Sequence, residues 1–126
     1  MNTEMVYDED RKRLNIKAYG SATVEGFRAL NTGMVEHPAW QPGVKVLCDF
    51  SALDLSNIYR QDAEGSAEFF RSFGQKNKGV RIACVMNNEL DYGMARMWAT
   101  LTTSHEVSFE IMVYRSIDEA VSWLHS

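Results

Sequence analysis

The 126-residue sequence predicts a single α/β domain with a mixed, mostly parallel sheet, an N-terminal β-hairpin and four helices. Three observations support this prediction. Apolar, strand-like runs alternate with stretches of helical periodicity along most of the chain. A charged turn separates the first two strand-like runs, which is typical of a hairpin. No linker, internal repeat or low-complexity segment interrupts the pattern, so residues 1–126 are expected to form one domain.

The first half of the chain predicts a hairpin, a helix and a buried strand. Residues 5–7 and 14–19 flank the charged turn, and the second run alternates apolar with polar side chains. Residues 20–23 break the strand and offer Ser or Thr as a helix N-cap. The helix is expected to stop before Pro38, because the residue before a proline avoids the helical conformation. Residues 44–49 form an apolar, β-branched run that predicts a buried strand ending at Asp49.

The second half predicts three helices and two strands. Residues 50–60 show no clear periodicity and are expected to be a connection. The last helix is the best marked, because Ser116 and Glu119 match a capping box. The predicted elements, in order, are a helix over 61–75, a strand over 80–85, a helix after Asn87-Asn88, a strand over 108–114 and a helix after Ser116.

The resulting order is β-β-α-β-α-β-α-β-α. Strands joined through helices need crossover connections, and these produce a largely parallel sheet with helices packed against it. The opening hairpin then adds an antiparallel strand at or near one edge.

Composition excludes several classes of partner. Seventeen acidic and 13 basic residues give a net charge of −4, whereas nucleic-acid binding needs a cationic surface. No apolar stretch is long enough to insert into a bilayer. The N-terminus lacks the pattern of a secretory signal, so we expect the protein to be cytoplasmic.

Asp49 and Ser51 are the first candidate site, because ligand sites gather at the carboxyl ends of strands in open α/β sheets. Ser51 could accept a phosphate and act as a regulatory switch. The alternative is a turn in which both side chains bond to the local backbone, and the residue types favour this second interpretation.

The sequence does not predict an enzyme. Nucleophilic catalysis needs an oriented base, but His37, His105 and His125 are scattered and no G-x-S-x-G motif is present. Metal-ligand spacings and phosphate-binding glycine loops are also missing from the sequence, so no metal and no cofactor are expected. Cys48 and Cys84 lie in strand-like runs and are interpreted as small buried hydrophobes rather than a redox pair.

Aromatic and methionine residues suggest a second candidate site. Such side chains at helical spacing usually form core, but they can also line an apolar pocket. The residues proposed for this pocket are Phe69, Phe73, Met94 and Trp98. Trp40, in a predicted loop, either covers the core or anchors a partner.

The chain resembles the SpoIIAA-like branch of the STAS superfamily, whose fold is related to that of CRAL-TRIO lipid-binding proteins. The matching segments are the hairpin that ends at Tyr19-Gly20, residues 44–53, which end in D-F-S-A-L, residues 81–85, and residues 114–124, which read Y-R-S-I-D-E-A-V-S-W-L. The resemblance implies a non-enzymatic α/β domain. It makes Ser51 the nearest counterpart of the serine that is phosphorylated in anti-sigma-factor antagonists, and Ser56 a weaker one.

The sequence therefore suggests two alternative functions. The first is a cytoplasmic regulatory or protein-interaction module that contacts its partner through the predicted strand-end loops, with Asp49, Ser56, Tyr59 and Tyr92 as candidate contacts. The alternative is a domain that binds a small, lipid-like apolar molecule. A symmetric homodimer is compatible with either function.

Overall fold

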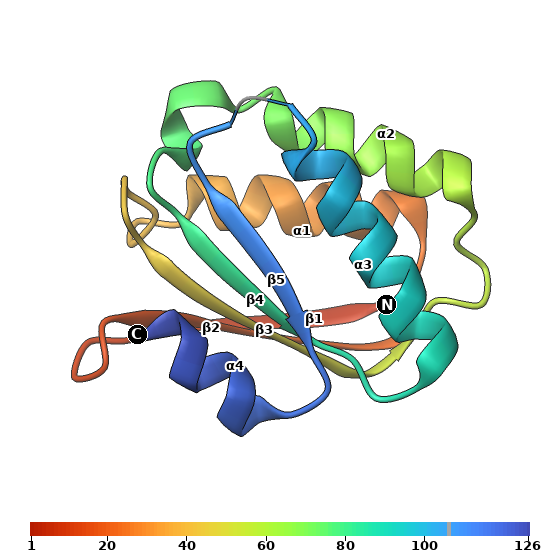
Figure 1. Ribbon diagram of the computed structural model, residues 1–126, viewed down its shortest axis with the longest axis horizontal. Helices are drawn as coiled ribbons and strands as arrows, with labels where there is room; N and C mark the ends of the chain where they lie inside the picture. Colours follow the sequence, from red (N-terminus) through yellow and green to blue (C-terminus); the bar gives the residue numbers. More distant parts are fainter. Residues whose placement is uncertain (106) are drawn as a thin grey trace.

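The computed structural model describes residues 1–105 and 107–126. Its five strands form one sheet in the order β1-β2-β3-β4-β5, in which β1 is antiparallel to β2 and the remaining pairs are parallel (Figure 1). The elements are β1 (Asn2–Asp8), β2 (Arg13–Ser21), α1 (Val24–Glu36), β3 (Lys45–Asp54), α2 (Arg60–Arg71), a short 3₁₀ helix (Gly74–Asn77), β4 (Arg81–Val85), α3 (Glu89–Thr103), β5 (Glu110–Tyr114) and α4 (Ile117–Leu124). The predicted fold class and element order are confirmed.

The helices cover the two faces of the sheet unequally. Helices α1, α2 and α3 lie on one face and α4 lies on the other (Figure 1). Strands β2 to β5 follow one another across the sheet in chain order, and each connection between them is a helical crossover. Such crossovers are right-handed, so three of them in the same direction place all three helices on the same side. We call this side the inner face and the α4 side the outer face.

Each face has its own apolar cluster. The inner cluster includes alternate residues of the central strands, such as Val46 and Cys48 of β3 and Ile82 and Cys84 of β4. The intervening residues of these strands point to the outer face, where Leu47 packs with α4. This alternation follows from the period of two in a β-strand.

The prediction that the third strand ends at Asp49 was wrong, because β3 continues to Asp54. Residues 52–54 pair with the end of β2 beyond a register shift between Lys17 and Tyr19. Leu53 is buried in the inner cluster, which explains why the pairing persists. Sequence periodicity missed this extension since the register shift interrupts the simple alternation.

The helix ends follow local capping chemistry. Thr23 and Ser116 accept hydrogen bonds from the backbone N–H groups of Gly26 and Glu119, as expected for N-caps. The predicted helix over 61–75 is shorter than expected: α2 ends at Arg71, and a 3₁₀ turn follows. Gly74 has a φ of +57°, a left-handed conformation that does not continue an α-helix.

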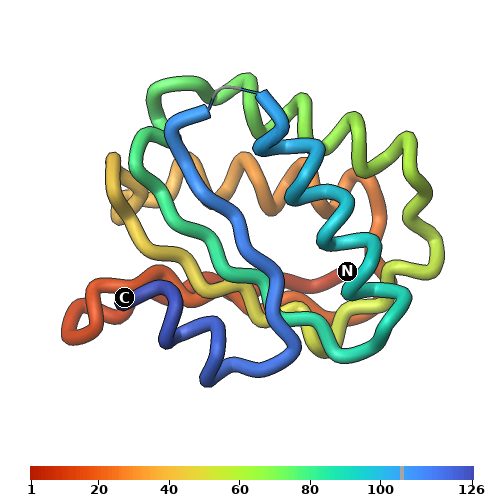
Figure 2. The backbone as a smooth tube through the Cα atoms, in the orientation of Figure 1, coloured from red at the N-terminus to blue at the C-terminus, as the bar shows by residue number. Residues whose placement is uncertain are grey.

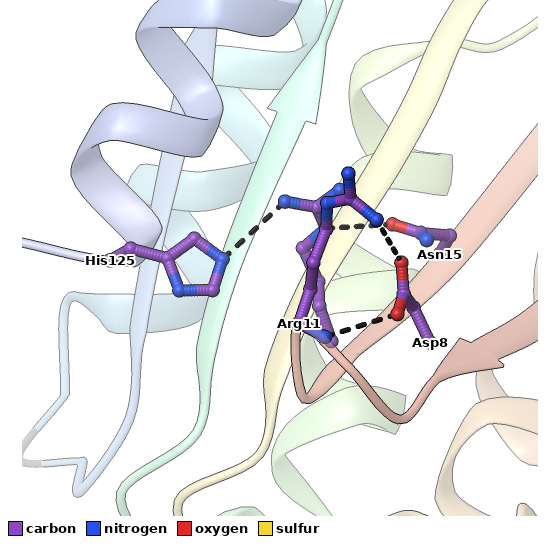
Figure 3. A network of polar contacts seen from close by, with 5 residues as sticks. Asp8, Arg11, Asn15 and His125 are labelled. Carbon is purple, nitrogen blue, oxygen red and sulfur yellow. Dashed lines mark hydrogen bonds and ion pairs between the residues drawn. The ribbon is translucent and has the colours of Figure 1, made fainter.

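Polar contacts join the hairpin turn to the C-terminus. Figure 2 shows the end of the chain beside the β1–β2 turn. Arg13 donates from Nε to Asn15 at 2.9 Å, and its Nη1 lies 3.4 Å from Nε2 of His125 (Figure 3). Within the turn, Arg11 pairs with Asp8 at 3.0 Å. These contacts are largely exposed, so they fix the position of the turn more than they stabilise the fold.

Candidate functional site

A cavity of about 280 Å³ lies on the inner face, between the sheet and helices α1, α2 and α3. Side chains of β3 and β4, together with the residue after β4, form its floor. These are Cys48, Phe50, Ile82, Cys84 and Met86. All five are buried and none carries a charge, so the floor is an apolar surface.

Helix α1 forms one wall of the cavity. The residues that line it are Val24, Phe27, Arg28, Leu30, Asn31 and Met34, which recur at the spacing of one helix face. On α2 the lining residues are Gln61, Asp62, Ala63, Gly65 and Ser66. Four of these wall residues, Val24, Arg28, Gln61 and Gly65, are also solvent-exposed, so the cavity opens between the N-terminal halves of α1 and α2.

Polar side chains of α1 and α2 line this opening, and we call them the polar seam: Arg28, Asn31, Asp62 and Ser66. Asn31 is 3% exposed and donates one long hydrogen bond, 3.4 Å from its Nδ2 to Oγ of Ser66. Asn31 makes no other side-chain hydrogen bond within the described part of the chain, so its carboxamide keeps unused bonding capacity at the cavity wall. The guanidinium of Arg28 lies 5.2 Å from the ring centre of Phe69, which turns it from α1 toward α2.

The seam contains one acidic residue, Asp62, and one basic residue, Arg28, and the two differ in their hydrogen-bond and ion-pair partners. Asp62 accepts a hydrogen bond from the backbone N–H of Tyr59 at 2.9 Å and sits in the first turn of α2. The positive end of that helix helps to compensate its charge. Arg28 has no carboxylate partner within 4.0 Å among residues 1–105 and 107–126. The opening therefore carries one positive and one negative side chain, and of the two only the carboxylate of Asp62 accepts a hydrogen bond from the backbone.

Cys48 and Cys84 are directly paired across β3 and β4 at the floor of the cavity. Both are free and buried. The hydrogen bond with Cys84, together with burial, raises the pKa of the Cys48 thiol well above its ordinary value. Cys48 therefore stays protonated at neutral pH, which makes it a poor nucleophile and an apolar part of the floor.

The pocket predicted from the sequence overlaps this cavity in part. Met94 and Trp98 of α3 line it. Phe69 and Phe73 were expected beside them but are not cavity residues. They pack edge to face on each other with ring centres 5.3 Å apart, and Phe73 also packs against the inner cluster.

Asp49 and Ser51 do not lie at a strand end. Both are in the interior of β3, on the outer face. Ser51 donates from Oγ to Asp49 Oδ1 at 2.6 Å, and its backbone N–H donates to the same oxygen at 3.1 Å. These are the local hydrogen bonds that the turn interpretation predicts for Asp49 and Ser51, but they form inside strand β3 rather than in a turn. Asp49 and Ser51 are far along the chain from any helix N-terminus, since α2 begins at Arg60.

The remaining predicted contacts are scattered at the carboxyl edge of the sheet. Ser56 donates its backbone N–H to Asp54, and Tyr59 caps α2 with 62% of its surface exposed. Tyr92 of α3 lies under the guanidinium of Arg115 at 4.3 Å. None of these three residues lines the cavity.

Trp40 is not available as an anchor for a partner. It is 8% exposed, its Nε1 donates to the backbone carbonyl of Lys76 at 2.9 Å, and its ring packs edge to face on Phe70. The tryptophan therefore covers the core, which was the other sequence-based interpretation. The loop position alone could not decide between the two interpretations, because a short loop can still turn a large side chain inward.

Sequence reasoning missed Arg28 and Asn31. A signal was present: Val24, Phe27 and Met34 form an apolar stripe on α1, and Asn31 interrupts that stripe at a core position. A polar residue at such a position needs a partner or a ligand.

No family model matches the chain, and no curated protein does. A solved structure does resemble it: the crystal structure of an uncharacterised protein of the DUF3478 family from Shewanella loihica PV-4, which has a SpoIIAA-like fold. The two superpose with a TM-score of 0.58 over 98% of this chain and 92% of the other, at 22% sequence identity. The fold is SpoIIAA-like. At this identity the similarity concerns the fold alone, and the sequence-based expectation of a SpoIIAA-like fold is confirmed.

The cavity lining combines an apolar floor, which includes two buried free cysteines, with a polar seam. None of the three histidines is among the lining residues. No helix in the described ranges 1–105 and 107–126 is both long and apolar enough to cross a membrane, and the same residues contain no group of His, Cys, Asp or Glu side chains arranged for a metal ion.

Proposed function

We propose that this domain binds a small, predominantly apolar molecule in the cavity between the sheet and helices α1 to α3. The observation that supports this function is the cavity itself. Folded domains normally fill such spaces with side chains, since a void costs its lining residues their dispersion contacts. A volume of about 280 Å³ approaches the range typical of small-molecule sites, and an apolar lining with a few polar groups is their usual character.

The volume also limits the size of the ligand. Liquid water occupies about 30 Å³ per molecule. The cavity of about 280 Å³ therefore holds roughly nine groups of that size. A chain of about eight carbons with one polar end matches this limit.

Thermal unfolding in the presence of 1-octanol tests the proposal. A ligand that binds only the folded state raises the unfolding temperature, and above its Kd the rise grows with the logarithm of the ligand concentration. We expect such a rise with 1-octanol, and native mass spectrometry should show one molecule bound per chain. The absence of any rise, together with the absence of a one-to-one complex, would rule the proposal out.

Two glycines provide a matched pair of variants. Gly65 on α2 lines the cavity, whereas Gly93 on α3 does not, and a Cβ atom added at either position meets no atom within 4 Å. Gly65→Leu should fill part of the opening and weaken 1-octanol binding, while Gly93→Leu should leave binding unchanged. Equal effects from the two substitutions would show that the alcohol binds elsewhere.

The regulatory and protein-interaction role remains a prediction. The feature that motivated it, Ser51, is exposed on the outer face and could be reached by a kinase. Its hydroxyl, however, is already bonded to Asp49. A phosphate there would stand beside that carboxylate, and the like charges would repel. Phosphorylation mass spectrometry after incubation with cell extract tests this role, and an unmodified Ser51 would argue against it.

A further inference from the structure

Resting on the proposed function, we infer that the ligand is an amphiphile with an anionic head group, a carboxylate being the simplest case, and that Arg28 and Asn31 bind this head. The apolar tail then lies on the floor formed by β3 and β4. Three features of the polar seam carry the inference.

The first feature is the free charge. Arg28 lines the opening and has no carboxylate partner within the described residues, whereas Asp62 already accepts a hydrogen bond at the start of α2. Arginine presents several N–H donors in a rigid plane, which suits the two oxygens of a carboxylate. A cationic head group would meet Arg28 with a like charge and is disfavoured.

The second feature is the position of Arg28. The cation lies above the ring of Phe69, with 5.2 Å between its central carbon and the ring centre. This contact uses the face of the guanidinium and leaves its N–H edge free for hydrogen bonds. Because Phe69 belongs to α2, the contact also keeps Arg28 across the gap between the two helices, where the cavity opens.

The third feature is Asn31, which lies one helical turn further along α1 than Arg28. Its side chain is almost fully buried and is held by a single long bond to Ser66. Its carboxamide oxygen and one of its N–H groups therefore have no protein partner among the described residues and are free to bond a ligand. A ligand head group that reaches from Arg28 to Asn31 would satisfy the missing bonds.

The test compares three ligands with the same eight-carbon tail: octanoate, 1-octanol and octylamine. Binding is measured by isothermal titration at pH 8 and low ionic strength, with each ligand kept below its micelle concentration. A hydrogen bond to a charged group is worth enough to give about tenfold tighter binding of octanoate than of 1-octanol. Octylamine should bind more weakly than the alcohol.

Arg28→Gln removes the charge and keeps much of the side chain. This variant should lose the preference and bind octanoate no better than it binds 1-octanol. Arg96→Gln is the matched control: Arg96 is an exposed helical arginine that also stacks on an aromatic ring, Tyr92, but does not line the cavity. Arg96→Gln removes one positive charge, as Arg28→Gln does, and should keep the preference for octanoate. Thermal unfolding of both variants verifies that they fold.

The outcomes separate this inference from the proposed function. If 1-octanol binds but octanoate is not preferred, or if both arginine variants reduce the preference equally, the anionic head group is excluded while the cavity function stands. If none of the three ligands binds, the proposed function fails and this inference fails with it.

Discussion

The inner face of the sheet is covered by three helices and encloses a cavity, whereas the outer face carries one helix over a small packed cluster and is otherwise open. Connection geometry explains the difference. Right-handed crossovers place α1, α2 and α3 on the inner face, and only the segment after the last strand reaches the other side. Helix α4 has 8 residues and is about 12 Å long, whereas the sheet of five strands is about 19 Å wide. One helix of this length leaves part of the outer face uncovered.

The comparison shows where a binding site can arise in this fold. A single short helix can pack tightly on the strands beneath it, and α4 does so against β3, β4 and β5. Three helices must satisfy packing against the sheet and against one another. Between α1 and α2 they leave a space whose walls carry polar residues. The layer with more helices is thus the less completely packed one, and function is expected there.

The largest expected effect concerns the packed part of the inner face. Phe70 is fully buried and makes edge-to-face contacts with Trp40, Trp98 and Phe109, at ring-centre distances of 6.5, 6.1 and 5.2 Å. Phe70→Ala should lower the free energy of unfolding by about 3–5 kcal/mol. Urea denaturation followed by tryptophan fluorescence measures the loss.

The neighbouring Phe69 is the control for Phe70. It is only partly buried and packs on Phe73 rather than on the sheet. Phe69→Ala should therefore cost clearly less. Equal losses would show that the aromatic cluster around Phe70 does not hold α2 and α3 to the sheet.

A second prediction compares the two faces directly. Leu124 of α4 is fully buried in the outer cluster, and Leu30 of α1 is 3% exposed but borders the cavity. A side chain beside a void has fewer partner atoms, so its truncation removes fewer dispersion contacts. Leu124→Ala should cost about 3–4 kcal/mol and Leu30→Ala about 2 kcal/mol. Denaturation of both variants under the same conditions gives the order, and a larger loss for Leu30 would contradict the difference in packing.

The sequence was sufficient to predict the secondary-structure elements and their order, but not the residues that line the cavity. Element order, the edge hairpin and the caps at Thr23 and Ser116 follow from local rules, namely hydrophobic periodicity and hydrogen bonding within a few residues. The unequal faces need one further fact, the spatial order of the strands: because β2 to β5 lie side by side in chain order, right-handed crossovers put three helices on one face.

The cavity depends on how side chains from five elements meet, which local rules do not contain. Met94 and Trp98 were placed in a pocket because α3 has a clear apolar stripe, but Phe69 and Phe73 could not be separated from them by spacing alone. Asp49 was assigned to a strand end because the register shift between β2 and β3 is a tertiary feature.

A third prediction uses the two helical glycines. Glycine inside a helix is less favourable than alanine by about 0.8–1 kcal/mol. At Gly65 and Gly93 an added Cβ meets no atom within 4 Å, so neither substitution is strained. Gly65→Ala and Gly93→Ala should each raise the free energy of unfolding by roughly 0.5–1 kcal/mol. Denaturant midpoints measure the gain, and a loss at Gly65 alone would mean that the α1–α2 opening is tighter than the cavity indicates.

The smallest expected effect lies at the open end of the outer face, where His125 approaches Arg13 (Figure 3). Partial desolvation, and then the positive charges of Arg13 and Lys45, lower the pKa of His125 below its ordinary value of 6.5. The unfolded chain therefore takes up this proton at a higher pH than the folded protein does. As the pH falls through 6.5 toward the lowered pKa, the folded state loses stability, and above that window the penalty is absent. Because His125 is exposed, solvent screening keeps the loss small.

His125→Gln isolates this contribution from the other titrating groups. Denaturation of the native protein and the variant from pH 5 to pH 8 should give parallel stabilities above pH 7 and a relative gain for the variant at the acidic end. A relative loss for the variant at acidic pH would mean that protonated His125 finds a favourable partner in the folded state. In that case the contact with Arg13 is not the repulsive one that the geometry indicates, and the open half of the outer face is more strongly organised than its exposure suggests.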